Sequence, residues 1–410
     1  MKILLTICLA ISAAFLISNK DIQPTDAILI QNDSLPPVEN RPPNSNYKPA
    51  FPGQTRVRGV KTKTPYKVEK IAENLGRPWA ITLLPDGRFV ITDKSGFMAI
   101  HSADGKQLKK ITGFPKVDDR GQGGMLDVAP DPDFDKNKIL YWSFSEPQEG
   151  NGTNLMAVAK GKLSADETSI QDVTVIFRAT PALRSNLHFG SRLLFDKSGY
   201  LFVSTGERSI LEGRRQAQLL ESGLGKIYRM TKDGKPAPGN PFLNNSNAVP
   251  QIYAYGVRNP QSLAFHPVTG DLWEAEFGPR GGDELNLIRP GKNYGWPVIT
   301  YGLEYSGQPV GDGIQQKEGM EQPVYYWDPV LSPSGMDFYR GDDIPEWKNN
   351  LFIGGLSGHI ARLVIENNKV VGEERIMEDK RERVRDVAYA NGMLYAVTDS
   401  GNMYRISRDR

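Results

Sequence analysis

The stretch 274–297 (EAEFGPRGGDELNLIRPGKNYGWP) mixes acidic, amide and aromatic side chains with closely spaced glycines. Glycine lets the backbone turn tightly, so peptide carbonyls can face a ligand that side chains would otherwise crowd out. Those carbonyls, together with Asp283 and Glu284, would suit a hard cation such as calcium. Glycine-rich acidic loops also serve simply as turns between strands, and the stretch alone leaves both interpretations open.

One histidine is placed where it could act as a base. His188 lies in the segment NLHFGSR at the start of a predicted strand, and a neutral imidazole accepts protons near neutral pH. A purely structural histidine is the alternative. The other histidines, at 101, 266 and 359, are far from it in sequence, so a site with several histidine ligands is not predicted.

Two short segments could hold an anion. Arg258 and Asn259 lie in YGVRNPQ, and Arg383 and Arg385 flank Val384. Guanidinium forks match carboxylates, so these segments could bind a polyanionic cofactor, although each arginine could equally form a surface ion pair. The sequence has no phosphate-loop, dinucleotide, serine-hydrolase or zinc-protease motif.

The elements that must position these residues follow one repeated unit, a short apolar strand, a Gly- or Asp-centred hairpin and a second short strand. The six copies are 79–92, 124–144, 192–205, 262–275, 335–354 and 384–398. Radial repetition of such a unit predicts an all-β fold, a six-bladed β-propeller spanning residues 65–410. The stretches 206–250 and 276–334 are predicted to be long connecting loops, where sites commonly lie.

The N-terminal residues have the pattern of an export signal. Residues 1–20 contain a charged start and an apolar run, which predicts a signal peptide or, if it is not cleaved, a membrane anchor. We therefore expect a periplasmic or extracellular protein that contacts the membrane only through this segment. Residues 21–64 are rich in Pro and Asn, and we predict a disordered linker.

Composition points to a small-molecule ligand. The chain has 410 residues, 39% hydrophobic content and a net charge of +2. Its basic residues form no stripe or tail, which argues against a nucleic-acid partner. The only cysteine, Cys8, lies in the predicted signal segment, so a cleaved protein would contain no disulfide.

Seven motifs in fixed order make the chain recognisable. They are GQGGMLDV (121–128), HFGSRL (188–193), TGE (205–207), GKIYR (225–229), RNPQ (258–261), GPRGGDE (278–284) and NYGWP (293–297). In these motifs the chain resembles the soluble aldose sugar dehydrogenases of the glucose/sorbosone dehydrogenase family, which use pyrroloquinoline quinone (PQQ). The resemblance runs from about residue 66 to the C-terminus.

The resemblance implies roles for individual residues. His188 falls on the base that removes the anomeric hydroxyl proton of an aldose while hydride passes to the quinone. Gln122 matches a residue at both cofactor and substrate, and Glu207 matches a carboxylate near the sugar. The implied cofactor contacts are Gln122, Arg258, Asn259, Tyr305, Ser357, Arg383 and Arg385. Gly278 and Pro279 match carbonyls that hold a calcium ion at the quinone, and Glu284 and Tyr294 match a structural calcium site. The resemblance also implies an electron acceptor outside the cytoplasm.

Two positions depart from the family. Phe277 stands where members of the family carry a polar residue, and Ser357 aligns with a cofactor-binding lysine. Loss of one ammonium beside a carboxylate weakens binding by about 1.5–3 kcal/mol, the size of a charged hydrogen bond. Phe277 could still stack on the quinone plane.

Three functions therefore stay open at the level of the sequence. The first is a quinone-dependent aldose dehydrogenase that forms lactones. The second is a calcium-stabilised propeller that binds carbohydrate or protein without turnover, which Phe277 and Ser357 favour. The third is a calcium-centred hydrolase on the same architecture. Fold alone does not choose among them, but His188 together with the quinone-contacting set favours the first.

Overall fold

The computed structural model describes residues 35–150 and 152–410. The predicted signal peptide or anchor, residues 1–20, lies outside the described residues, as does the first part of the predicted linker. Within the described part of the chain, no helix is long and apolar enough to cross a membrane.

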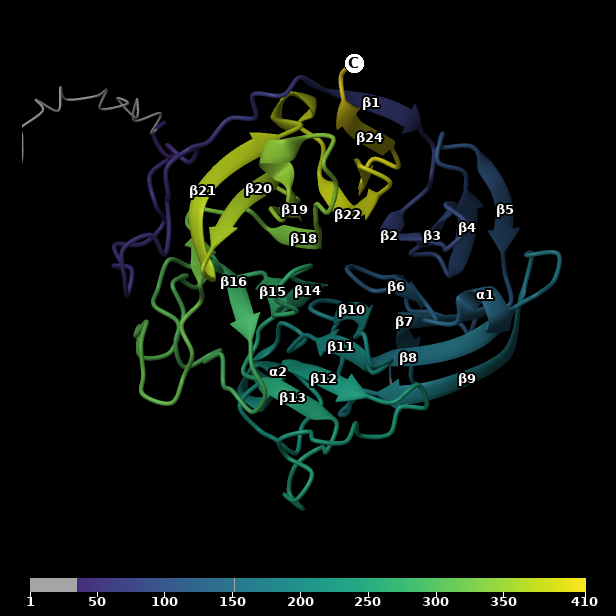
Figure 1. Ribbon diagram of the computed structural model, residues 1–410. Helices are drawn as coiled ribbons and strands as arrows, with labels where there is room; N and C mark the ends of the chain where they lie inside the picture. The colour runs from purple at the N-terminus through teal and green to yellow at the C-terminus, as the bar shows by residue number, and fades with distance from the viewer. Residues whose placement is uncertain (1–34, 151) are drawn as a thin grey trace, which may run out of the picture. The chain divides into compact units, whose positions relative to one another are not determined.

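The described residues form six four-stranded antiparallel sheets arranged as blades around a centre (Figure 1). Blade 1 contains β2 (Pro78–Leu83), β3 (Phe89–Asp93), β4 (Phe97–His101) and β5 (Gln107–Ile111). Blade 2 contains β6 (Met125–Pro130), β7 (Ile139–Pro147), β8 (Asn154–Leu163) and β9 (Ile170–Arg178). Blade 3 contains β10 (Gly190–Phe195), β11 (Leu201–Thr205), β12 (Lys226–Met230) and β13 (Ile252–Tyr255).

The remaining blades follow the same order from the inside outward. Blade 4 contains β14 (Pro260–Phe265), β15 (Leu272–Glu276), β16 (Asp283–Ile288) and β17 (Tyr325–Trp327). Blade 5 contains β18 (Pro333–Phe338), β19 (Leu351–Gly355), β20 (His359–Glu366) and β21 (Lys369–Ile376). Blade 6 contains β22 (Val384–Ala390), β23 (Met393–Thr398), β24 (Met403–Arg408) and β1 (Tyr66–Ala72). The short helices are α1 (Phe134–Asn137), α2 (Leu211–Gln216), η1 (Pro345–Trp347) and η2 (Glu378–Lys380).

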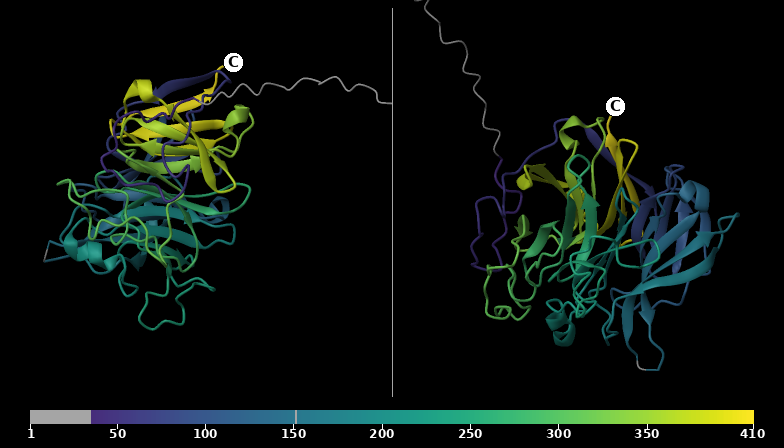
Figure 2. Two further views of the ribbon diagram at one scale, coloured as in Figure 1. Left: turned by 90° about the vertical axis from the view of Figure 1, so that its left-hand side faces the viewer. Right: turned by 60° about the horizontal axis from the view of Figure 1, so that its bottom comes forward.

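The six-bladed propeller prediction is confirmed. Each predicted repeat corresponds to the first two strands of one blade. The inner strands β2, β6, β10, β14, β18 and β22 contact one another in a closed ring. Views from two further sides show the same blades as separate twisted sheets (Figure 2). The prediction that these two stretches are long connecting loops is wrong in part. Residues 206–250 contain α2 and β12, and residues 276–334 contain β16 and β17.

Ring closure joins the two ends of the folded chain. β1 pairs antiparallel with β24, from Tyr66 opposite Arg408 onward, and so completes blade 6. This pairing covers the outer edge of β24 and makes β1 the outermost strand of blade 6. Large aromatic side chains fill the space within and between blades, among them the fully buried Trp142, Trp273 and Trp347.

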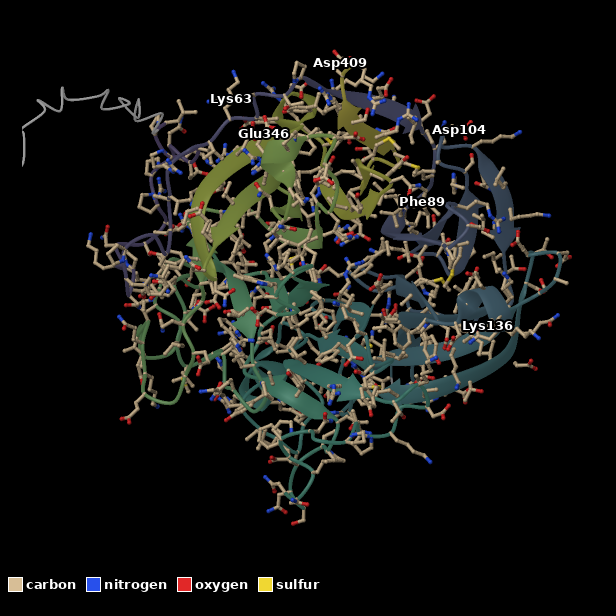
Figure 3. All side chains as sticks on the ribbon, in the orientation of Figure 1. Lys63, Phe89, Asp104, Lys136, Glu346 and Asp409 are labelled. Carbon is tan, nitrogen blue, oxygen red and sulfur yellow. The ribbon has the colours of Figure 1, made fainter. Side chains whose placement is uncertain are left out.

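Residues 35–64, which we call the N-terminal strap, pack against the propeller. Asp328 accepts hydrogen bonds from the amides of Asn44 (2.7 Å) and Ser45 (3.1 Å). Glu346 accepts from the amides of Lys63 (2.7 Å) and Thr64 (2.6 Å), and Lys63 and Glu346 lie together in Figure 3. The disordered-linker prediction is therefore wrong for residues 35–64. The composition of the strap does not predict that it is ordered, because its polar groups form hydrogen bonds with residues of blades that are distant in the sequence.

Candidate active site

A cavity of about 320 Å³ draws its lining from all six blades. Its lining residues are Arg77, Pro78, Trp79, Lys94, Gly121, Gln122, Leu126, Phe189, Gly190, Gln261, Phe277, Leu356, Arg383, Arg385 and Asp399. Most lie near the beginning of an inner strand, since all six inner strands start from the same side of the ring. Four lie one residue beyond the end of a second strand, namely Lys94, Phe277, Leu356 and Asp399. One end of the propeller thus gathers side chains that are far apart in the sequence.

The cavity lining is cationic with aromatic walls. Arg77, Lys94, Arg383 and Arg385 line it, and the one lining carboxylate is Asp399. Asp399 accepts from Arg383 Nε (2.9 Å) and Arg385 Nε (2.7 Å). These two ion pairs hold the pKa of Asp399 below its ordinary value. The rings of Trp79, Phe189 and Phe277 complete the lining. Cations around flat apolar walls suit a planar ligand that carries carboxylates.

His188 lies at the entry to β10 beside this cavity. Its Nδ1 lies 2.5 Å from Glu207 Oε1, and its main-chain amide donates to Gln122 Oε1 (2.8 Å). Burial, reinforced by Arg258, lowers the pKa of His188 to about 4. The imidazole is therefore neutral at pH 7. A neutral ring that donates from Nδ1 to a carboxylate leaves Nε2 free to accept a proton.

Glu207 is positioned for that hydrogen bond by the local backbone. Its Oε1 also accepts from the amide of Ser209 (2.9 Å), and its own amide donates to the carbonyl of Arg258 (2.9 Å). Its Oε2 is buried without a hydrogen-bond partner in the described part of the chain. The sequence-based role of Glu207 beside the sugar stays a prediction, and the geometry places this carboxylate against His188.

The backbone around His188 and Glu207 is strained. His188, Arg208 and Ser209 adopt left-handed conformations, with φ of 48°, 73° and 60°, which L-residues adopt at a cost of roughly 1–3 kcal/mol each. The fully buried Arg208 guanidinium offsets this cost. It donates to the carbonyls of Leu187 (3.2 Å) and Asn154 (3.0 Å) and stacks on Phe189, with 4.1 Å from Cζ to the ring centroid.

Arg258 and Asn259 lie directly beside the cavity. Asn259 Oδ1 accepts from the amide of Gly190 (3.0 Å), while its Nδ2 is buried with no hydrogen-bond partner in residues 35–150 or 152–410. Arg258 Nη1 donates to the carbonyls of Phe277 (2.9 Å) and Gly278 (2.6 Å). Unpartnered polar groups next to a cationic cavity are the donors that a bound quinone carboxylate or carbonyl would use.

The main chain at Gly278 is suited to a cation. Two carbonyl oxygens, those of Phe277 and Gly278, converge on one guanidinium nitrogen of Arg258. A Cβ on Gly278 would lie 2.3 Å from the carbonyl oxygen of Gly282, so only glycine fits. Oxygen ligands from the main chain match calcium. Pro279 follows in the same buried turn.

Glu284 lies in a buried acidic group with Glu274 and Glu276. Burial raises the pKa of Glu276 to about 7 and those of Glu274 and Glu284 well above their ordinary values. Asn286 Nδ2 donates to Glu274 (3.1 Å) and Glu284 (3.3 Å). Buried carboxylates without a bonded cation would be stabilised by one. Among the described residues, however, no three acidic, histidine or cysteine side chains form a metal-ligand group, so calcium here would need main-chain ligands as well.

Two candidates of the calcium interpretation are already occupied. Asp283 accepts from the amides of Gly278 (2.8 Å), Leu331 (2.8 Å) and Ser332 (2.7 Å), so it stabilises turns. The Tyr294 hydroxyl donates to the carbonyl of Leu287 (2.7 Å). Calcium binding by Tyr294 would therefore use its main-chain carbonyl.

The structure does not bring every predicted residue together. Gln122, Arg383 and Arg385 line the cavity, and His188, Glu207, Arg258 and Asn259 lie next to it. Tyr305 is 72% exposed and is not part of the lining. Ser357 lines a neighbouring cavity with His359 and Arg375, whereas Leu356 faces the cationic one.

Sequence reasoning missed Arg77, Lys94 and Asp399. A signal existed for two of them, because Lys94 and Asp399 hold the same blade position as Phe277, one residue beyond a second strand. Comparing equivalent positions across the six repeats would have identified them.

Known proteins are similar to this chain over most of its length. A family model described as glucose / sorbosone dehydrogenase matches residues 75–405. The aldose sugar dehydrogenase YliI of Escherichia coli strain K12 is 40% identical over 346 residues, which cover 83% of this chain and 92% of that protein. A crystal structure of a glucose dehydrogenase is 41% identical with a TM-score of 0.79, covering 84% of this chain and 99% of that one. The PQQ-bound form of aldose sugar dehydrogenase from Streptomyces coelicolor is 26% identical with a TM-score of 0.68, covering 85% and 99%.

Proposed function

Because this chain belongs to the glucose/sorbosone dehydrogenase family, we propose that it is a quinoprotein oxidoreductase that oxidises the anomeric carbon of aldose sugars to lactones. The observation that carries the proposal is the His188–Glu207 hydrogen bond, 2.5 Å long, beside a cavity lined by four cations. A base and an anion-binding cavity in contact are what such a reaction requires.

The chain's own residues perform the proton chemistry. Glu207 holds the Nδ1–H of His188, so Nε2 faces the substrate as a base and accepts the proton of the anomeric hydroxyl. Burial keeps the His188 pKa at about 4, so the base is ready at neutral pH. As the proton leaves, the C1–H bond releases its electron pair as hydride, and the sugar becomes a lactone.

PQQ, when bound, supplies the two-electron acceptor for that hydride. Gln122, Arg383 and Arg385, which line the cavity, would contact PQQ directly. Arg258 and Asn259, which lie beside the cavity, would add further donors. Phe277 offers a flat face in the same lining, which supports stacking on a planar ring. Calcium held by the main-chain carbonyls of Gly278 and Pro279 would act as a Lewis acid on the quinone, and the buried main chain of this glycine-containing turn supports this part of the proposal.

We also propose that residues 1–20 direct export, so that the sugar and an electron acceptor are met outside the cytoplasm. The charged start and apolar run of this segment support the proposal. Mass spectrometry should find either a periplasmic protein whose N-terminus lies near residue 20 or, if the segment is an uncleaved anchor, the full chain in the membrane fraction. Recovery of the full chain from the cytoplasm would contradict export.

Reconstitution tests the proposed reaction. Apo-protein mixed with calcium and PQQ should reduce an artificial dye in the presence of aldoses, and omission of either component should abolish turnover. Binding of PQQ should also raise the melting temperature, since a ligand specific to the folded state stabilises it. An absence of both turnover and melting shift would contradict the proposal and favour the non-catalytic propeller.

A further inference from the structure

Three of the four cations lining the cavity already have carboxylate partners. Arg77 pairs with Asp119, and Arg383 and Arg385 share Asp399. Lys94 makes no ion pair with any residue that the structure describes. It is therefore the one cation of the lining whose charge no carboxylate of the described residues neutralises.

The main chain holds Lys94 firmly in place. Its amide donates to the carbonyl of Arg77 (3.0 Å), and its carbonyl accepts from the amide of Met125 (3.1 Å). These bonds tie it to both blade 1 and blade 2. Its Nζ donates to the carbonyl of Gly121 (2.6 Å), next to Gln122. An ammonium group has three N–H donors, so two remain for a ligand in the cavity.

The surroundings of Lys94 are short of negative charge. Burial and the nearby charges of Arg385 and Arg77 lower the pKa of Lys94, against weaker opposing effects of Asp399 and Asp119. An anion in the cavity would relieve this repulsion and accept the free N–H donors. The aromatic walls restrict that anion to a flat one.

We propose that Lys94 is a cofactor-binding residue that donates a charge-assisted hydrogen bond to a carboxylate of the quinone. The inference rests on the proposed function and assigns a cofactor contact to blade 1 through Lys94, the one lysine of the cavity lining. Ser357 does not share this role, because it faces the neighbouring cavity with His359. The cations of blade 6 and those of blade 1 would thus hold the polycarboxylate from two sides.

Titration of PQQ into calcium-loaded apo-protein, followed by tryptophan fluorescence and calorimetry, measures this contact without turnover. Lys94→Met should raise the Kd about 10- to 100-fold, the effect of losing one charged hydrogen bond of about 1.5–3 kcal/mol. Lys94→Arg should stay within about fivefold of the unmodified protein, because a guanidinium keeps the positive charge and N–H donors for a carboxylate. Lys106→Met, an exposed lysine of the same blade, is the matched control and should bind normally.

The trimethyl ester of PQQ separates a direct contact from a structural effect. If Lys94 bonds a carboxylate, Lys94→Met should weaken binding of the ester by no more than about twofold. An equal loss for PQQ and for its ester, or an unchanged Kd for PQQ, would overturn the inference. The proposed function fails separately, if the unmodified protein binds no PQQ at all.

Discussion

The hydrogen bond between His188 and Glu207 decides which imidazole nitrogen is available for chemistry. With Oε1 of Glu207 accepting from Nδ1 at 2.5 Å, the proton stays on Nδ1 and Nε2 is the basic atom. Burial lowers the pKa of His188 to about 4 despite the carboxylate, because removing the imidazolium from water outweighs the attraction. The residue is thus a permanently neutral base at physiological pH.

His188→Ala should lower turnover of the reconstituted protein by about 10²–10⁴, the contribution of a general base. The Kd for PQQ should change little, because the side chain does not belong to the cavity lining. Steady-state kinetics and PQQ titration measure the two quantities. His266→Asn, in the hairpin between β14 and β15 of blade 4, is the control, and an H188A variant with full activity would refute the role of base.

Glu207→Gln tests the positioning role through the pH profile. In the unmodified protein kcat/KM should rise with pH on an acid limb near the His188 pKa of about 4. Glu207 raises that pKa, so its replacement should shift the limb to lower pH. The plateau should fall roughly 10²-fold or more, because an amide can donate to Nδ1 and stabilise the wrong tautomer. An unchanged plateau between pH 6 and 8 would show that Glu207 does not orient the base.

At the scale of elements, equivalent positions of the blades build the site. Gln122, His188, Asn259 and Arg383 each lie within three residues of the start of an inner strand. Lys94 and its equivalents in blades 4, 5 and 6 lie just beyond second strands. A short, buried strand cannot move without disturbing its neighbours, so side chains at its end are held rigidly. The strap fixes the outer side of blades 4 and 5 in the same way.

Asp328→Ala should release part of the strap. Asp328 is buried and accepts from Asn44 (2.7 Å), Ser45 N (3.1 Å) and Ser45 Oγ (3.1 Å), and loss of a charged acceptor for several donors costs roughly 2–4 kcal/mol. Thermal denaturation and limited proteolysis of residues 35–64 measure the effect. Asp342→Ala, which removes an exposed partner of Lys348, should be nearly neutral. Equal protease resistance in both variants would show that Asp328 does not hold the strap against the propeller.

At the scale of the whole molecule, Arg192 links the inner strands across the axis. Its Nη1 contacts Asp127 of blade 2 (3.1 Å) and Asp386 of blade 6 (3.2 Å), and its Nε donates to the carbonyl of Gln261 in blade 4 (3.0 Å). Its guanidinium stacks on Trp79, 4.7 Å from the ring centroid. Trp79 and Gln261 line the cationic cavity, so this buried ion triad forms the support beneath the site.

Arg192→Met should destabilise the propeller by about 3–5 kcal/mol, because it leaves two buried carboxylates without a countercharge. Burial already raises the pKa of Asp127 to about 6 and that of Asp386 above its ordinary value. In the variant the pKa values of Asp127 and Asp386 should rise further. Both carboxyls would then stay protonated in the folded state at pH values where the unfolded chain has already released those protons. The stability of the variant should therefore fall from pH 5 to pH 8.

Urea denaturation at the two pH values measures this effect. Arg88→Met is the matched control, since Arg88 also pairs with two carboxylates but at the surface, where ion pairs contribute little. A variant at 192 that matches the control at both pH values would show that the triad does not hold the blades together.

The sequence by itself determined the inner half of every blade, the number of blades and most of the residues around the base. Hairpins such as 79–92 are visible because alternation and turn residues are local properties. The outer strands were harder to predict: β5 (QLKKI) is largely exposed and polar, and β12 lies inside a stretch rich in turn residues. Residues in motifs, such as Gln122 and Arg383, were found because the motif itself marks them.

Tertiary structure alone decided which side chains share the cavity. Lys94 and Arg77 meet Arg383 and Arg385 only because β1 closes the ring on β24 and brings blade 1 beside blade 6. Leu356, not Ser357, lines this cavity, since neighbouring residues of a loop point to different sides. Such contacts depend on long-range packing that no local pattern contains. The order of residues 35–64 has the same cause, because their hydrogen-bond partners lie up to 336 residues away in the chain.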